Sequence, residues 1–235
     1  MNAMILAAGR GTRLGELSMT TPKALVIVAG EPMLARQIRY LRQGGIERIV
    51  VNAHHLADQI ERFAASHELA EEIDVVVEPE LLGTAGGVLN ALPLLGEDFM
   101  VLYGDVIVDE PIERMRETHT RLGGACTAAV YRTNEVLGKG TVEVDETGTI
   151  VGFQEKAYTS IEGEAYVNAG VYFMGSALLS ELPSGVPLDF GHDVFPRALQ
   201  RGEKMVVHVL EKPVIDMGTP DALEMARERG AEKVA

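Results

Sequence analysis

The chain has 235 residues, 46% of them hydrophobic and 24% charged, and it carries a formal net charge of −14. This composition is that of an ordinary globular protein, and the acidic balance argues against a nucleic-acid surface, which needs a basic stripe. No apolar run approaches the roughly 20 residues that a membrane span requires. The single cysteine, Cys126, excludes an internal disulfide and a cysteine-clustered zinc site. Because the start lacks the basic and apolar segments of a secretory signal, we expect a cytoplasmic protein.

The first half of the sequence alternates apolar strands with amphipathic helices. Strands are predicted over 3–7, 48–52, 73–77 and 99–103, and helices over 32–43, 56–67 and 86–94. Strands that are apolar on both sides and alternate with helices indicate a parallel sheet covered on both faces. The first half is therefore predicted to be a doubly wound α/β structure.

The pattern changes after residue 124. Strand-like segments cover 125–132, 140–156, 166–174 and 205–210, with a hairpin turn at 146–148. Helices are predicted over 175–182, 193–201 and 220–229. No Pro/Ser-rich linker separates 1–124 from 125–235, so we predict one domain, 1–235, whose second half extends the sheet of the first.

The first predicted strand runs directly into a glycine-rich segment, AAGRGTRLG, at residues 7–15. Glycine-rich turns after a buried strand bring backbone N–H groups close to an anion, most often phosphate. The spacing G-x-G-x-x-x-G and the early Pro22 disfavour a dinucleotide-binding helix, and the string G-x-x-x-x-G-K-[ST] of a P-loop is absent from the sequence. The segment therefore favours a loop around the phosphates of a free nucleotide, with Arg13 and Lys23 neutralising their charge.

Six segments in chain order resemble the sugar-1-phosphate nucleotidyltransferases: AAGRGTRL with TTPKALVIVAGEPML, then EPELLGTAGGVLNAL, VLYGDVIVD, GFQEK, YVNAGVYFM and VIDMGTPDAL. Within that family the chain resembles the mannose-1-phosphate and heptose-1-phosphate guanylyltransferases most, followed by the N-acetylmuramate-1-phosphate uridylyltransferases. The resemblance implies a Rossmann-like three-layer α/β sandwich, with a mostly parallel mixed central sheet and a sugar-binding sheet extension. It further implies an enzyme that transfers a nucleoside monophosphate from a nucleoside triphosphate to a sugar 1-phosphate and releases pyrophosphate.

The same resemblance assigns roles on the nucleotide side, in 1–124. Arg13 would stabilise the departing pyrophosphate, Lys23 would reach the α-phosphate, and Asp105 would take part in catalysis. Asp105, at the end of an apolar strand where α/β sheets bind ligands, and Asp216 would hold Mg²⁺, which prefers hard oxygen ligands. The implied nucleotide-binding residues are Leu6, Ala8, Gly9, Gly11, Thr12, Glu78, Gly83 and Thr84.

On the sugar side, in 125–235, the resemblance implies a lysine that grips the sugar phosphate and a turn that binds the sugar. Lys156 is that lysine, and Glu155 would accept hydrogen bonds from sugar hydroxyls. The remaining implied contacts are Gly140, Asn168 and Gly170. The family usually has proline after its Glu-Lys pair, whereas this chain has Ala157. Neither Asp189 and Asp193 nor the six histidines receive a role in the chemistry.

The identity of the nucleotide base is the feature of the substrates that the sequence constrains least. A carboxylate only accepts hydrogen bonds and suits the adjacent donors of guanine, so Glu78 favours GTP, with UTP, CTP and dTTP as alternatives. The sugar is expected to be a heptose or mannose 1-phosphate. A non-catalytic nucleotide-sugar sensor is disfavoured, because the chain keeps Arg13, Lys23, Asp105, Lys156 and Asp216. We expect a monomer or homodimer, with neither nucleic acid nor membrane as a partner.

Overall fold

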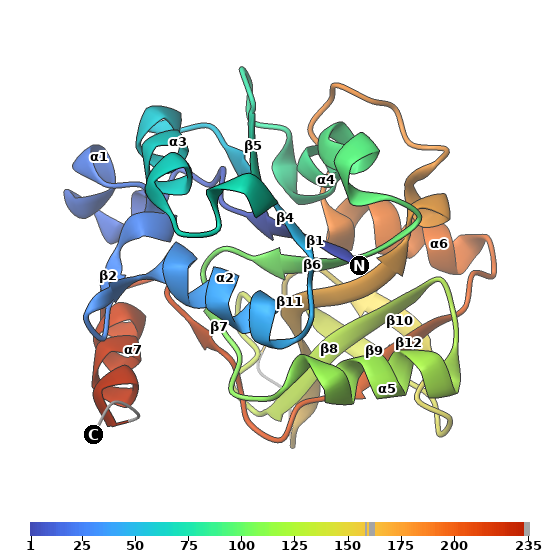
Figure 1. Ribbon diagram of the computed structural model, residues 1–235. Coiled ribbons are helices and arrows are strands. Elements are labelled where there is room, and N and C mark those ends of the chain that lie inside the picture. Colours follow the sequence, from blue (N-terminus) through green and yellow to red (C-terminus); the bar gives the residue numbers. More distant parts are fainter. Residues whose placement is uncertain (158, 160–162, 233–235) are drawn as a thin grey trace.

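Nine strands form one mixed sheet in the computed structural model, which describes residues 1–157, 159 and 163–232 (Figure 1). The strands are β1 Asn2–Leu6, β4 Arg48–Ala53, β5 Ile73–Val77, β6 Asp98–Tyr103, β8 Cys126–Thr133, β9 Thr141–Val144, β10 Ile150–Gln154, β11 Ala165–Gly175 and β12 Met205–Val209. Their order is β10-β9-β11-β6-β1-β4-β5, and β8 pairs with both β11 and β12. The strands β6, β1, β4 and β5 are parallel, whereas β11 is antiparallel to β6, β8 and β9.

Helices α2 Met33–Gln43, α3 Ala57–Ser66, α4 Gly83–Leu95, α5 Ile112–Leu122 and α6 Phe195–Gln200 cover both faces of this sheet. Two further helices, α1 Leu17–Thr20 and α7 Pro220–Glu232, lie beside it. Side chains of a strand alternate between faces, so Ile5 packs with α2, α3 and α5, while its neighbour Met4 packs with α4 and α6. Figure 1 shows α4 and α6 above the sheet and α2 and α5 below it. The predicted Rossmann-like three-layer α/β fold is confirmed.

Three predictions about helices need correction. The helix α5 was not predicted, because its sequence IERMRETHTRL places only three residues, Ile112, Met115 and Thr118, in buried positions. The helix expected over 175–182 is a short 3₁₀ turn, Ser176–Leu179. The helix expected over 193–201 is α6 preceded by a π-helical turn, Phe190–Val194. Pro196 has no N–H and suits only a first helical turn, so α6 begins at Phe195.

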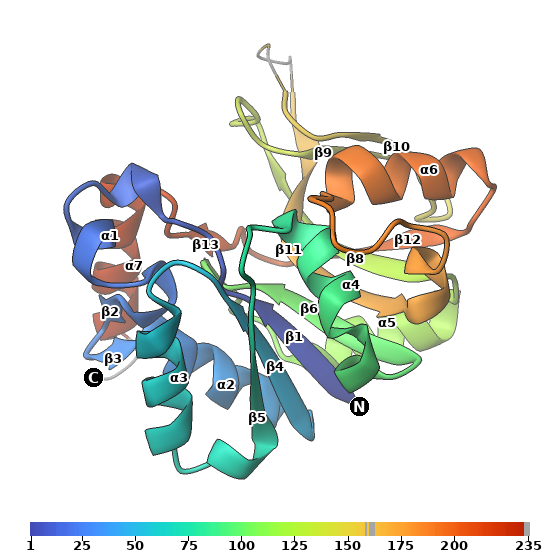
Figure 2. The same cartoon turned by 90° about the horizontal axis from the view of Figure 1, so that it is seen from above.

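The end of the chain returns to its beginning. Helix α7 packs its Leu223 and Ala226 with Val26 and Val28, around the short hairpin of β2 (Ile27–Val28) and β3 (Glu31–Pro32). Figure 2 shows α7 beside α1 and β2, on the side of the molecule away from β9 and β10. Just before α7, β13 (Ile215–Asp216) pairs with β7 (Val106–Ile107). This pairing brings Asp216 to the residues that directly follow Asp105.

Candidate functional site

A cavity of about 340 Å³ opens where the parallel strands β1, β4 and β6 end. Its walls combine residues from all three strand ends with residues of the segment before α6 and of the segment 81–84, which leads into α4 and includes its first two residues (hereafter the 81–84 loop). The lining residues are Leu6, Ala7, Ala8, Gly9, Lys23, Ala24, Asn52, Leu81, Gly83, Thr84, Tyr103, Gly104, Asp105 and Asp189. The carboxyl end of a parallel sheet is where α/β proteins bind their ligands. Seven of the predicted site residues line this cavity: Leu6, Ala8, Gly9, Lys23, Gly83, Thr84 and Asp105.

The glycine-rich segment forms the turn between β1 and α1. Gly11 adopts a left-handed conformation, with φ 61°, and an added Cβ there would lie 3.2 Å from the Cβ of Lys23. A larger residue at this position would therefore be strained and would crowd Lys23. Gly9, which lines the cavity, and Thr12 are both exposed, so this part of the turn is open to solvent.

Lys23 lies between two carboxylates. Its Nζ donates a hydrogen bond to Asp105 Oδ2 and lies 4.0 Å from Asp216 Oδ1. The guanidinium of Arg13 packs against Gly218, two residues beyond Asp216, and the Asp216 carboxylate also accepts a hydrogen bond from the Gly218 N–H at 2.6 Å. The structure thus gathers Arg13, Lys23, Asp105 and Asp216 as one cluster at the edge of the cavity.

Burial and neighbouring charges together set the pKa of Asp216 in this cluster. Withdrawal from water and the nearby Asp105 carboxylate raise the pKa of Asp216, while Lys23 and Arg13 act in the opposite direction. The described residues contain no group of three or more His, Cys, Asp or Glu side chains arranged to hold a metal. The two carboxylates fit Mg²⁺, which binds one or two carboxylates and completes its shell with phosphate oxygens and water.

The five residues expected on the sugar side are not among those that line the cavity. Gly170, with φ 70°, lies against the ring of Tyr103, and its N–H donates to Asn168 Oδ1 at 3.2 Å. Gly140 lies close to both Asn168 and the backbone of Glu155. This group of four residues therefore reaches the cavity wall where Gly170 lies against Tyr103.

Glu155 and Lys156 directly follow β10, and the Glu155 carboxylate lies against Gly191. Burial and the Asp189 carboxylate raise the pKa of Glu155, and Lys156 opposes this rise. Lys156 itself is exposed. Its loop is held by backbone hydrogen bonds between Ala157 and the 138–139 turn, where Gly138 N donates to the Ala157 carbonyl at 2.9 Å and Ala157 N to that of Lys139 at 3.0 Å. Because this chain has Ala157 where the family usually has proline, it keeps a backbone N–H that proline would lack.

Asp189, which sequence reasoning left without a role, lies in the cavity wall. Its Oδ1 accepts a hydrogen bond from the Thr84 hydroxyl at 2.7 Å, and the same hydroxyl oxygen accepts one from the Phe190 N–H at 3.0 Å. The contact joins the start of α4 to the segment before α6. It connects positions 105 residues apart in the chain, so no local motif could have revealed it.

Asn52 was also missed, and it changes the interpretation of Glu78. The Glu78 side chain is 1% exposed, and its two oxygens accept hydrogen bonds from Asn52 Nδ2 at 2.6 Å and from the Leu82 N–H at 3.0 Å. Glu78 therefore lies beneath the cavity wall and not in it. The prediction that its carboxylate reads the base is not supported, because both oxygens already bind groups of the protein.

The histidines make contacts that suit structural roles. His208 is buried between Glu110 and the Thr118 hydroxyl, and His55 contacts the Ser18 carbonyl oxygen at 2.8 Å. His192 is exposed beside Asp193. In the part of the chain that the structure describes, no helix is both long enough and apolar enough to cross a membrane.

Comparisons with known proteins agree with this geometry. A model of the nucleotidyl transferase family matches residues 2–233. The UTP–glucose-1-phosphate uridylyltransferase of Synechocystis is 30% identical over 97% of this chain and 63% of its own length. The catalytic subunit beta of the mannose-1-phosphate guanylyltransferase of Xenopus tropicalis is 32% identical over 94% of this chain and 62% of its own length. The chain thus spans less than two thirds of the length of these curated relatives.

Solved structures show the same architecture. HddC from Yersinia pseudotuberculosis, complexed with GMP-PN, aligns with a TM-score of 0.82 and 25% identity over 100% of this chain and 99% of that one. A putative glucose-1-phosphate thymidylyltransferase from Bacillus anthracis, in complex with a sucrose, aligns with a TM-score of 0.86, covering 99% of this chain and 96% of that one. The latter is 22% identical and supports the fold alone. Because the family model matches residues 2–233 and the fold agrees with it, the chain belongs to the nucleotidyl transferase family.

Proposed function

We propose that this protein transfers a nucleoside monophosphate from a nucleoside triphosphate to a sugar 1-phosphate, with release of pyrophosphate. The observation that carries the proposal is the position of Lys23, which lies between Asp105 and Asp216 at the edge of a cavity lined by the glycine-rich turn. A lysine flanked by two carboxylates offers charges of both signs where a triphosphate and a phosphate must meet. Such a reaction depends mainly on positioning and on neutralising charge.

In the proposed reaction, an oxygen of the sugar phosphate attacks the α-phosphorus of the nucleotide, and pyrophosphate leaves from the opposite side. Backbone N–H groups of 8–12 hold the triphosphate, and Arg13 neutralises the charge of the leaving pyrophosphate. Lys23 leaves Asp105 to contact the α-phosphate, where negative charge increases in the transition state. Lys156 binds the phosphate of the sugar from the other side of the cavity.

Asp105 and Asp216 would hold Mg²⁺, which when bound would supply positive charge to the phosphate oxygens. Support for this assignment comes from the position of the two carboxylates on either side of Lys23. The raised pKa of Asp216 agrees with it, because this rise reflects withdrawal from water first and repulsion by the Asp105 carboxylate second. A divalent cation would relieve that repulsion. It would also free Lys23 from its hydrogen bond to Asp105.

We propose GTP as the nucleotide and a heptose or mannose 1-phosphate as the sugar. Support comes from the mannose-1-phosphate guanylyltransferases among the relatives and from the likeness to a protein crystallised with GMP-PN. Because Glu78 faces the protein interior, backbone groups of the 81–84 loop are left to contact the base. UTP is the second candidate, favoured by the similarity to a uridylyltransferase.

A pyrophosphate-release assay that crosses GTP, UTP, CTP and dTTP with mannose, heptose, glucose and N-acetylmuramate 1-phosphates tests the proposal. We expect the highest kcat/KM for GTP with mannose or heptose 1-phosphate, and loss of turnover in the Asp105→Asn variant. The highest value for UTP would replace GTP in the proposal. Nucleotide binding without turnover of any pair would overturn it and favour a sensor of nucleotide sugars.

A further inference from the structure

Two segments that line the cavity are joined by a chain of buried hydrogen bonds through Asn52, which itself lines the cavity, and Glu78, which does not. Asn52 Oδ1 accepts from the Ala7 N–H at 2.7 Å, in the strand end that leads into the glycine-rich turn. Asn52 Nδ2 donates to Glu78 Oε1 at 2.6 Å, and Glu78 Oε2 accepts from the Leu82 N–H at 3.0 Å. Ala7 and the neighbours of Leu82, Leu81 and Gly83, all line the cavity. One polar connection therefore links two parts of the cavity lining that come from different segments of the chain.

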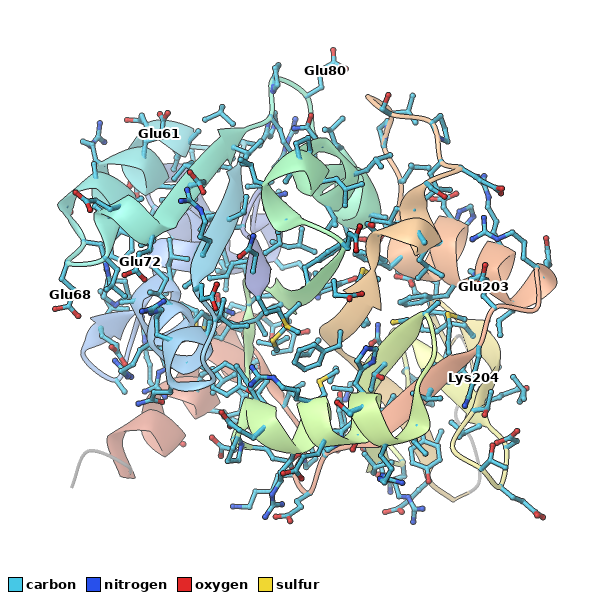
Figure 3. The ribbon with its side chains drawn as sticks, turned by 45° about the vertical axis from the view of Figure 1, so that its right-hand side comes forward. Glu61, Glu68, Glu72, Glu80, Glu203 and Lys204 are labelled. Carbon is cyan, nitrogen blue, oxygen red and sulfur yellow. The ribbon has the colours of Figure 1, made fainter. Side chains whose placement is uncertain are left out.

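The packing around this connection leaves it little freedom. Asn52 and Glu78 are each 1% exposed. Gly87 of α4 lies directly against the pair, since an added Cβ there would be 2.6 Å from Asn52 Nδ2 and 2.7 Å from Glu78 Oε1. The absence of a side chain at Gly87 thus makes room for the pair. Figure 3 shows the contrast with Glu80, two residues further along the same loop, whose side chain points outward from the tip of the loop.

We propose that Asn52 and Glu78 are positioning residues that set the spacing between the glycine-rich turn and the 81–84 loop, and that Glu78 does not contact the base. The inference rests on the proposed function for its activity assay, but its binding assay needs only a nucleotide. In each of these hydrogen bonds, the donor and the acceptor are fixed. The amide at 52 accepts from one side and donates to the other, and the carboxylate at 78 accepts on both sides.

This arrangement of donors and acceptors allows a test by exchange. In Glu78→Gln, at least one N–H group faces another N–H group, however the amides at positions 52 and 78 are turned. In Asn52→Asp, two carboxylates face each other. In the double variant Asn52→Asp/Glu78→Gln, the new carboxylate at position 52 would accept from both the Ala7 N–H and the side chain at position 78. The new amide at position 78 would donate to position 52 and accept from the Leu82 N–H. The double variant thus restores all three hydrogen bonds with the net charge unchanged.

We expect each single variant to weaken nucleotide binding, measured by calorimetry with GTP and UTP, by about 10-fold or more, because buried polar groups are left facing groups of the same kind. The KM for the nucleotide should rise by a similar factor, with the KM for the sugar 1-phosphate changed less. The double variant should recover to within about threefold of the parent, since residues in direct contact are strongly coupled. Its GTP to UTP ratio should equal that of the parent. Gly87→Ala should act like a single variant, and the exposed Glu80→Gln should change nothing.

Several outcomes would overturn the proposal. No recovery in the double variant would show that the carboxylate at 78 is itself required. A changed GTP to UTP ratio in the double variant would show that Glu78 reads the base. If a single variant unfolds, the comparison of the double variant with Glu80→Gln still decides between these outcomes. Failure of the proposed function is distinguishable, because it removes turnover from the parent protein while nucleotide binding remains measurable.

Discussion

Asp105 and Asp216 approach the same lysine from distant parts of the sequence, one after β6 and the other from β13. Each residue alone could be an ordinary turn residue. Together with Lys23 they form a site in which positive and negative charges are within a few ångströms of one another. At this scale the proposed chemistry depends on single charges, so conservative substitutions are informative.

Asp105→Asn and Asp216→Asn each remove one negative charge and keep the size of the side chain. We expect each to lower kcat by at least about 100-fold at limiting Mg²⁺, because a two-carboxylate site loses half of its charge. Steady-state pyrophosphate release over a Mg²⁺ titration measures this. Circular dichroism should show the same fold, and full activity at limiting Mg²⁺ in either variant would contradict the assignment.

The raised pKa of Asp216 predicts a pH dependence. Mg²⁺ binding needs the ionised carboxylate, so affinity for Mg²⁺ should fall as the pH decreases from about 7 toward the carboxyl range near about 4. The effect on stability has the opposite sign: a carboxyl with a raised pKa in the folded state stabilises the fold at low pH, and this contribution is lost as the pH rises. Mg²⁺ titrations at several pH values, followed by activity, test the first part. A flat Mg²⁺ affinity over this range would contradict it.

Lys156→Ala should raise the KM for the sugar 1-phosphate by about 10-fold or more and leave the KM for the nucleotide nearly unchanged. A charge-assisted hydrogen bond to phosphate contributes roughly 1.5–3 kcal/mol. Lys204→Ala is a matched control, because Lys204 lies elsewhere on the surface (Figure 3) and donates to the Leu122 carbonyl. A rise in the nucleotide KM instead would place Lys156 on the other side of the cavity.

At the scale of elements, the site is shaped by where strands end and bend. The ladder between β11 and β8 breaks its register between Asn168 and Tyr172, and Gly170 occupies the break with φ 70°. A left-handed residue at a break in the ladder is typical of a β-bulge, which redirects neighbouring side chains. Here the bend brings Gly170 against the ring of Tyr103, a residue of the cavity wall.

Gly170→Ala should therefore both strain the backbone and displace Tyr103, because the added Cβ would lie 2.7 Å from Tyr103 Cγ. We expect a loss of about 1–3 kcal/mol in the free energy of unfolding together with weaker substrate binding. Urea denaturation and KM values measure the two effects. Gly185→Ala is the matched control, with φ 74° but no atom within 4 Å of the added Cβ. Equal effects of both variants would show that the contact with Tyr103 contributes nothing.

The elements that the sequence predicts well are those whose side chains are apolar on both faces. Strands β1, β4, β5 and β6 were found within about a residue of their bounds for this reason. Two-residue strands such as β7 and β13 carry no periodicity, so their pairing could not be predicted, although it brings Asp216 to Asp105. The direction of the Glu78 side chain was equally hidden, since it depends on Asn52, 26 residues away in the chain.

At the scale of the whole molecule, buried polar contacts fix how the layers of helices and strands are placed against one another. Hydrophobic packing alone does not fix this placement. His208 of β12 lies between Glu110 and the hydroxyl of Thr118 in α5, and all three side chains are nearly buried. The contact joins α5 to the sheet, and none of its three residues lines the cavity. It belongs to stability and not to the proposed chemistry.

His208→Leu should accordingly lower the free energy of unfolding by about 1–3 kcal/mol, since it leaves the buried Glu110 carboxylate and Thr118 hydroxyl without this partner. The KM values for both substrates should stay within about twofold of the parent. Chemical denaturation and steady-state kinetics give the two readouts. His192→Ala, at an exposed position, should leave stability unchanged, and a large change in KM for His208→Leu would link this contact to the site.

The long strand β11 limits how far the two halves of the chain can move or be exchanged independently. Along one edge it pairs first with β9, at Tyr166 and Val167, and then with β6, over Val171–Gly175. The segments before and after residue 124 are therefore not two bodies that could rotate about a hinge, because such a rotation would break the five residue pairs between β11 and β6. An exchange of the second half with that of a relative would succeed only if the incoming strand kept the register of β11 against β6. A shift by one residue would turn every side chain of the strand to the opposite face, and Asn168 with it.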